Sequence, residues 1–201
     1  MKHVLARNCI AVLCLLFFPG LLEAQTLAGS KLVAALQQGG LVIVMRHTSS
    51  PRVAPDSVTV NTDNVNAERQ LDEKGRRDAA LFGEALRRLQ VPLGEVRSSP
   101  AYRALETARL AGLDDATVQE ELGNEGMSDS TEQYAEWLRK QVADQPRMGI
   151  RLLITHGPNI NAAFPGESAG MEEGDALVFD PEGSTGPILV ARIKCADWAA
   201  L

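Results

Sequence analysis

The spacing of hydrophobic residues switches between helical and strand periods along the first third of the chain. Apolar residues in 27–36 recur at helical intervals, and two glycines at 39–40 would end that helix. The unbroken, largely β-branched run at 41–45 is typical of a strand covered on both faces. Residues 48–68 are rich in Ser, Pro, Asn, Asp and Thr, which predicts a long loop.

Further helices and strands alternate through the rest of the sequence. An amphipathic helix is predicted at 73–90, because its apolar residues from Phe82 to Leu89 fall at i, i+3, i+4 and i+7. A short strand at 95–98 leads to a helix that Ser99 caps and Pro100 begins. The remaining predicted elements are a helix that begins at Ser130, a strand at 150–155 and a hairpin of 176–180 with 188–193.

This alternation predicts an α/β fold, a three-layer α/β/α sandwich with a mostly parallel central sheet. No internal repeat and no second core are visible, so residues 25–201 are expected to form a single domain. In such sheets ligands bind beyond the carboxyl ends of the strands. Candidate functional residues are therefore sought directly after the predicted strands.

The first residues of the chain have the pattern of a secretory signal peptide. A short basic stretch with Lys2 and Arg7 precedes an apolar run at 9–22, and Ala24 lies near the expected cleavage site. The competing interpretation, a membrane anchor, needs about 20 apolar residues, and Pro19 with Gly20 interrupts a run that is already shorter. We therefore predict that residues 1–24 are a signal peptide and that the protein is exported, either periplasmic or secreted, with no membrane association after cleavage.

Composition and charge exclude one class of partner. The formal charge is −6, the isoelectric point is near 5.1, and the aromatic residues are 5 Phe, 2 Trp and 2 Tyr. An acidic chain with few aromatic rings has neither the positive field that holds a phosphate backbone nor the surfaces on which bases stack. Nucleic acid is not expected as a partner.

Two histidines are the strongest candidates for chemistry. His47 and His156 each follow a predicted strand, so both are expected at the same edge of the sheet. An arginine also accompanies a strand end in two places: Arg46 directly precedes His47, and Arg103 lies in the first turn of the helix that follows the strand at 95–98. Guanidinium groups and helix N-termini both bind phosphate oxygens, which makes this edge a local anion site in an acidic protein.

The same residues favour phosphoryl transfer over other chemistries. Neither a cluster of zinc ligands nor a Gly-x-Ser-x-Gly or His-Glu-x-x-His motif is present. A neutral imidazole at His47 can attack a phosphoryl group that the arginines hold, while His156 donates to oxygens that gain charge. The alternative is a protein that binds phosphate or a phosphorylated ligand without turning it over.

Three segments, at 44–47, 98–108 and 154–157, resemble the histidine phosphatase superfamily in order, spacing and position after strands. The resemblance implies a phosphoglycerate mutase-like fold and a metal-independent phosphomonoesterase that needs no cofactor and acts on a phosphorylated small molecule. It also implies that His47 is phosphorylated, with the phosphate held by Arg46, Arg103 and His156. Thr48 occupies a position that is usually glycine in this superfamily.

The acid that protonates the leaving group is a carboxylic acid whose position varies within the superfamily. Glu125 lies within a residue of the place where the mutase-like branch carries it. The rival candidates are Glu121, Asp63 and Glu68. Each of these carboxylates could also be an ordinary exposed loop residue.

Overall fold

The computed structural model describes residues 26–123, 131–183 and 186–201, and its centre is a six-stranded sheet in the order β3-β2-β4-β1-β5-β6. Three neighbouring pairs, β3 with β2, β2 with β4 and β4 with β1, are parallel, whereas β5 runs antiparallel to both β1 and β6. The prediction of a mostly parallel sheet is therefore confirmed. The strands are β1 (Val42–Arg46), β2 (Leu93–Ser98), β3 (Thr117–Val118), β4 (Ile150–Thr155), β5 (Ala176–Asp180) and β6 (Ile188–Ile193).

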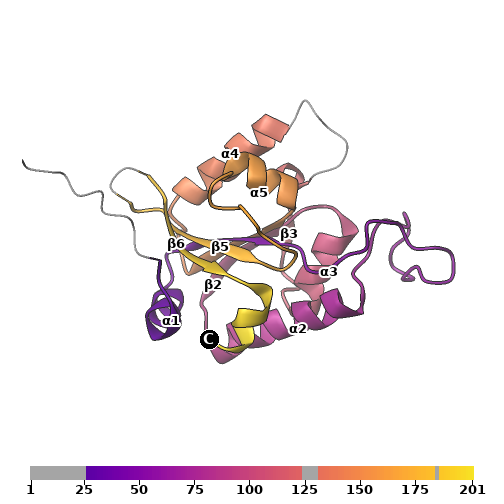
Figure 1. The fold of residues 1–201 in the computed structure, drawn as a ribbon, viewed down its shortest axis with the longest axis horizontal. Helices are drawn as coiled ribbons and strands as arrows, with labels where there is room; N and C mark the ends of the chain where they lie inside the picture. The colour runs from indigo at the N-terminus through magenta and orange to yellow at the C-terminus, as the bar shows by residue number, and fades with distance from the viewer. Residues whose placement is uncertain (1–25, 124–130, 184–185) are drawn as a thin grey trace, which may run out of the picture.

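Helices cover both faces of this sheet, as Figure 1 shows, which gives the predicted three layers. Successive residues of a strand point to opposite faces. Ile43 and Met45 of β1 face one core, with α1 (Gly29–Gln38), α2 (Glu73–Arg88) and α3 (Tyr102–Leu110). Val42 and Val44 face the other core, with α4 (Thr131–Ala143) and α5 (Gly157–Ala163). Two short 3-10 helices, η1 (Glu120–Leu122) and η2 (Cys195–Ala199), complete the described elements.

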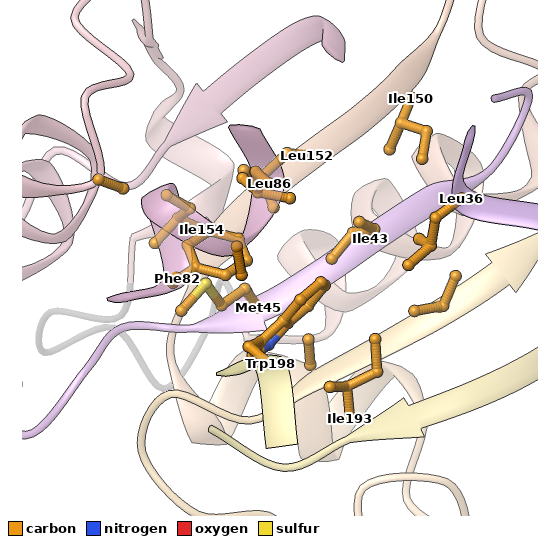
Figure 2. Packing of buried hydrophobic residues seen from close by; sticks show 14 of the residues in the cluster. Leu36, Ile43, Met45, Phe82, Leu86, Ile150, Leu152, Ile154, Ile193 and Trp198 are labelled. Carbon is orange, nitrogen blue, oxygen red and sulfur yellow. The ribbon is translucent and has the colours of Figure 1, made fainter. Parts of the chain in front are cut away.

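A tryptophan from η2 packs into the core that lies between the sheet and the helices α1, α2 and α3. Trp198 is 1% exposed, and its ring meets Phe82 of α2 edge to face with 4.9 Å between the ring centroids. Figure 2 shows both rings among the aliphatic side chains of the central strands. The end of the described chain is thus fixed against α2, and Arg88 of that helix donates a hydrogen bond to the Trp198 carbonyl at 3.1 Å.

The beginning of α2 lies against the segment that follows β1. Asp72 caps the helix, its carboxylate accepting a hydrogen bond from the Gly75 amide at 2.7 Å, as expected for an N-cap. A Cβ atom at Gly75 would lie 2.1 Å from the Ser49 carbonyl oxygen, so glycine is needed for this close approach. The packing of α2 therefore fixes the backbone just after His47.

Two local predictions need correction. The third helix begins at Tyr102 rather than at Pro100, and Ala101 is its N-cap residue. Ser99 does not cap it: the serine hydroxyl accepts the Ala101 amide at 3.2 Å and also contacts His156. The helix α5 and the two-residue strand β3 were not predicted.

Some predictions fall on residues outside the described ranges. These are the signal peptide at 1–24, the predicted helix start at Ser130 and the candidate acid Glu125. Among the residues that the structure does describe, no helix is long and apolar enough to cross a membrane.

Candidate active site

His47 and His156 lie next to each other because the strands that precede them are paired. In the parallel register Arg46 lies opposite Thr155, so the next residue of each strand is a histidine at the same edge. The His47 amide donates a hydrogen bond to the Thr155 carbonyl at 3.0 Å, and the two ring centroids are 5.1 Å apart. The expectation that both histidines reach one edge of the sheet is confirmed.

Hydrogen bonds fix the proton of His47 on Nδ1. That nitrogen lies 2.8 Å from the Thr48 carbonyl oxygen, which can only accept, so Nδ1 carries the hydrogen. Nε2 is then the nitrogen with a free electron pair, and it accepts a hydrogen bond from Nε of Arg103 at 3.3 Å. His47 therefore presents a nucleophilic nitrogen to the arginine that was expected to bind phosphate.

His156 has the opposite tautomer. Its Nδ1 lies 3.1 Å from Nη2 of Arg103, a group that can only donate, so Nδ1 accepts. Nε2 must then carry the proton, and it donates to the Ser99 hydroxyl at 2.7 Å. One guanidinium group thus connects the two imidazoles, and both rings are held in defined orientations.

Burial keeps both imidazoles neutral. His47 is 3% exposed and His156 is 1% exposed. Removal from water lowers the pKa of His47 to about 3 and that of His156 to about 2, with smaller contributions from the nearby arginines. Burial is thus the larger cause of the lowered pKa of each histidine, and the positive charge of the arginines is a smaller one.

Arg46 enters the site from the end of β1. Its Nη2 forms an ion pair of 2.9 Å with Glu173, and its Nη1 donates to the Met171 carbonyl at 3.3 Å. Its Nε is buried and has no hydrogen-bond partner among the described residues. A buried donor without a partner is costly, and here a ligand oxygen could accept from it.

Arg69 is a further site residue that the sequence reasoning missed. Its side chain donates to the Pro51 carbonyl at 2.6 Å and the Ser50 carbonyl at 2.9 Å, which anchors it beside the segment after His47. Its positive charge contributes to the lowered pKa of both His47 and His156. The signal for it was weak, since Arg69 follows the predicted loop and precedes a predicted helix without any motif of its own.

The candidate acids differ in their surroundings. The Glu68 carboxylate accepts a hydrogen bond from the Tyr102 amide at 3.0 Å. It therefore lies at the start of α3, beside the residue that precedes Arg103 in the sequence. Asp63 accepts the Tyr102 hydroxyl at 2.6 Å, and this bond lowers the pKa of Asp63, which does not suit a proton donor. Glu121 accepts from the Gln119 side chain.

The described side chains of the site are mainly arginine guanidinium groups, which donate hydrogen bonds, and two neutral imidazole rings. Within the described ranges no three His, Cys, Asp or Glu side chains form a group that could hold a metal ion. Three arginines, Arg46, Arg69 and Arg103, instead surround the histidine pair, as the bonds and pKa shifts above show. This arrangement can bind a tetrahedral anion in front of Nε2 of His47.

Comparison with solved structures supports the fold. The protein histidine phosphatase SixA in complex with tungstate has a TM-score of 0.57 at 20% identity, covering 78% of this chain and 98% of that one. A phosphoserine phosphatase from Entamoeba histolytica in complex with phosphoserine has a TM-score of 0.51 at 14% identity, covering 77% and 97%. A mycobacterial glucosyl-3-phosphoglycerate phosphatase with bound VO3 has a TM-score of 0.52 at 18% identity, covering 76% and 99%.

Comparison with sequences identifies the family. None of the curated proteins matches this chain significantly. The family model described as histidine phosphatase superfamily (branch 1) matches residues 42–152, more than half of the 201 residues. The matched region runs from β1, which ends at Arg46, through α3 with Arg103, to β4. The chain belongs to branch 1 of the histidine phosphatase superfamily.

Proposed function

We propose that this protein is a metal-independent phosphomonoesterase that acts through a phosphohistidine on His47. The observation that carries the proposal is the tautomer of His47, whose Nδ1 is bound to the Thr48 carbonyl so that Nε2 keeps its electron pair. The same Nε2 lies 3.3 Å from Nε of Arg103. The nucleophilic nitrogen and an anion-binding guanidinium group are therefore in direct contact.

The reaction begins when the phosphoryl oxygens of a phosphorylated small molecule bind the guanidinium groups of Arg46 and Arg103. Nε2 of His47 then attacks phosphorus in line with the ester oxygen, the N–P bond forms, and the P–O bond to the leaving group breaks. As charge develops on an equatorial oxygen, His156 donates to it from Nδ1, the nitrogen that faces Arg103. This step needs the other tautomer of His156, in which the Ser99 hydroxyl donates to Nε2. Water then cleaves the N–P bond and releases inorganic phosphate.

The leaving oxygen needs a proton from a carboxylic acid. The resemblance to the mutase-like branch favours Glu125, whereas the described contacts favour Glu68, at the start of α3. Loss of the true acid should slow alkyl phosphates far more than aryl phosphates, because an aryl oxide leaves without protonation. Comparing Glu125→Gln with Glu68→Gln on both substrate types assigns the role.

The proposed function includes export. The basic stretch and apolar run at 1–22 support a signal peptide that ends near residue 24, which would place the mature enzyme in the periplasm or outside the cell. Mass spectrometry of the intact protein recovered outside the cytoplasm tests this. A full-length chain recovered in the membrane fraction would contradict it.

The decisive experiment separates the nucleophile from the anion site. His47→Ala should reduce hydrolysis of an aryl phosphate to near background while vanadate still binds to the arginines. Wild-type enzyme exposed to a labelled substrate should keep the label on His47 after a basic quench and lose it after an acidic quench, because phosphohistidine is labile in acid. Wild-type turnover by His47→Ala, or label on another residue, would contradict the mechanism, and anion binding without any turnover in the wild type would indicate a phosphate-binding protein.

A further inference from the structure

The turn at 171–175 surrounds Arg46 with contacts that the proposed reaction does not use. The Met171 carbonyl accepts from Nη1 of Arg46 at 3.3 Å. The Gly174 amide donates to the carbonyls of Arg46 at 3.2 Å and His47 at 3.0 Å, and the Arg46 amide donates to the Asp175 carbonyl at 3.0 Å. A segment far from β1 in sequence therefore holds both the backbone and the side chain of Arg46.

Glu173 provides the charged contact in this turn. One carboxylate oxygen pairs with Nη2 of Arg46 at 2.9 Å, and the other accepts the Ser50 amide at 3.1 Å. The side chains of Arg46 and Glu173 are 19% and 22% exposed, so the pair is mostly shielded from water. A carboxylate held at both oxygens has little freedom, and it restricts the guanidinium that it binds.

The contacts leave one buried nitrogen of Arg46 without a hydrogen-bond partner in the described part of the chain. Nη1 and Nη2 are bonded to the turn, whereas Nε is buried without a partner in the described part of the chain. The guanidinium lies against Gly157, at the start of α5, where an added Cβ would be 3.5 Å from Nε, Cζ and Nη1. Gly157 directly follows His156, so the unoccupied Nε–H lies close to the histidine pair.

We infer that Glu173 is a positioning residue, which holds Arg46 so that its buried Nε–H is the donor that receives a phosphoryl oxygen. This inference rests on the proposed binding of phosphate at the histidine pair. A flexible arginine that is fixed before binding loses less conformational freedom when the anion arrives, and the anion binds more tightly. A residue that acted simply through its negative charge would have the opposite effect, because a carboxylate near an anion site repels the anion.

The sign of the effect on vanadate affinity therefore tests the inference. Glu173→Gln offers one oxygen instead of two, so either Arg46 or the Ser50 amide loses its acceptor, and the ion pair is lost. The matched control is Glu172→Gln, which removes the same charge from an exposed neighbour in the same turn. We expect calorimetry to show vanadate bound about fivefold to tenfold more weakly by Glu173→Gln, on the order of one lost charge-assisted hydrogen bond, and unchanged by Glu172→Gln.

A double-mutant cycle shows whether Glu173 acts through Arg46. If it does, Glu173→Gln should cause no further loss of vanadate affinity in an Arg46→Ala background. Affinity in Glu173→Gln that equals or exceeds that of Glu172→Gln, or an equal loss in both backgrounds, would overturn the inference. Glu173→Ala repeats the comparison if the glutamine variant does not fold. Because binding is measured without turnover, wild-type protein that fails to bind vanadate would instead overturn the proposed function.

Discussion

Arg103 donates from Nε to Nε2 of His47 across 3.3 Å, so the proposed nucleophile is already engaged by the residue proposed to bind its target. The same guanidinium contacts Nδ1 of His156 at 3.1 Å. A phosphoryl oxygen that accepts from Nε of Arg103 takes the place of Nε2 of His47 as the acceptor of that N–H group. Binding of the anion at this N–H group therefore also releases the electron pair of His47.

Replacing Arg103 should change the titration of both histidines as well as turnover. Arg103→Ala removes a positive charge that lowers the pKa of His47 and His156, so both pKa values should rise, although burial keeps them below 6.5. Turnover should fall by about 100-fold or more, since a charge-assisted fork to the transition state is lost. NMR titration of the ring resonances and aryl phosphate kinetics provide the measurements.

Arg109→Ala is the matched control for that variant, because it removes a half-exposed arginine from the same helix. Its histidine titration and turnover should match the wild type. Unchanged histidine pKa values in Arg103→Ala would contradict the contact described above.

The two buried histidines should make the protein less stable in acid. Their pKa values in the folded protein, about 3 and about 2, lie below the ordinary value of 6.5, so below about pH 6.5 the unfolded chain binds protons that the folded protein does not. The free energy of unfolding should therefore fall as pH falls, by up to about 1.4 kcal/mol per pH unit for each histidine. Urea denaturation of wild type and His156→Asn at several pH values between 7 and 4 measures this. Equal slopes for the two proteins would contradict it.

Thr107 should be needed to hold the His47 and Arg103 segments together. Its hydroxyl donates to the Arg103 carbonyl at 2.8 Å and lies 3.2 Å from both the amide and the hydroxyl of Thr48. Thr107→Val leaves the buried Thr48 amide without an acceptor, which should reduce the free energy of unfolding by about 1–3 kcal/mol and also lower kcat/KM. Thr107→Ser keeps the hydroxyl and should restore both values in urea denaturation and kinetics, and its failure to do so would assign the effect to packing of the methyl group.

Chelation should leave the hydrolysis of an aryl phosphate unchanged. In the proposed mechanism the guanidinium groups of Arg46 and Arg103 supply the positive charge that a metal ion supplies in other phosphatases. The rate is measured after prolonged dialysis against a chelator and again after zinc or magnesium is added back. Loss of activity that either metal restores would contradict this mechanism.

The central part of the fold could be predicted because its signals are local. The runs that form β1 and β4 are mostly apolar, with four apolar residues in each strand, and the β5 and β6 boundaries match the predicted hairpin residue for residue. By contrast, β3 has two residues and α5 has seven, too few to show a period. The start of α3 was misplaced because Ser99 followed by Pro100 is typical of a helix start. In the structure the Ser99 hydroxyl is hydrogen-bonded to His156 instead.

The candidate site could be predicted as far as it depends on strand ends. His47 and His156 come together because paired parallel strands bring their following residues to one edge. Arg69 and Glu173 act through contacts with segments distant in sequence, such as the Ser50 carbonyl and the Arg46 guanidinium, and their own surroundings in the sequence carry no motif. Such contacts follow from the topology of the sheet, which periodicity alone does not determine.

The edge-to-face contact between Trp198 and Phe82 also constrains when the protein can acquire its native structure during synthesis. Phe82 and the strands around it are translated long before residue 198, so a nascent chain that lacks the tryptophan leaves a large apolar surface of α2 uncovered. Such a chain resembles the substrates of cellular chaperones more than a finished domain. A chain cut short before Trp198 should therefore be digested by proteases faster than one that includes it.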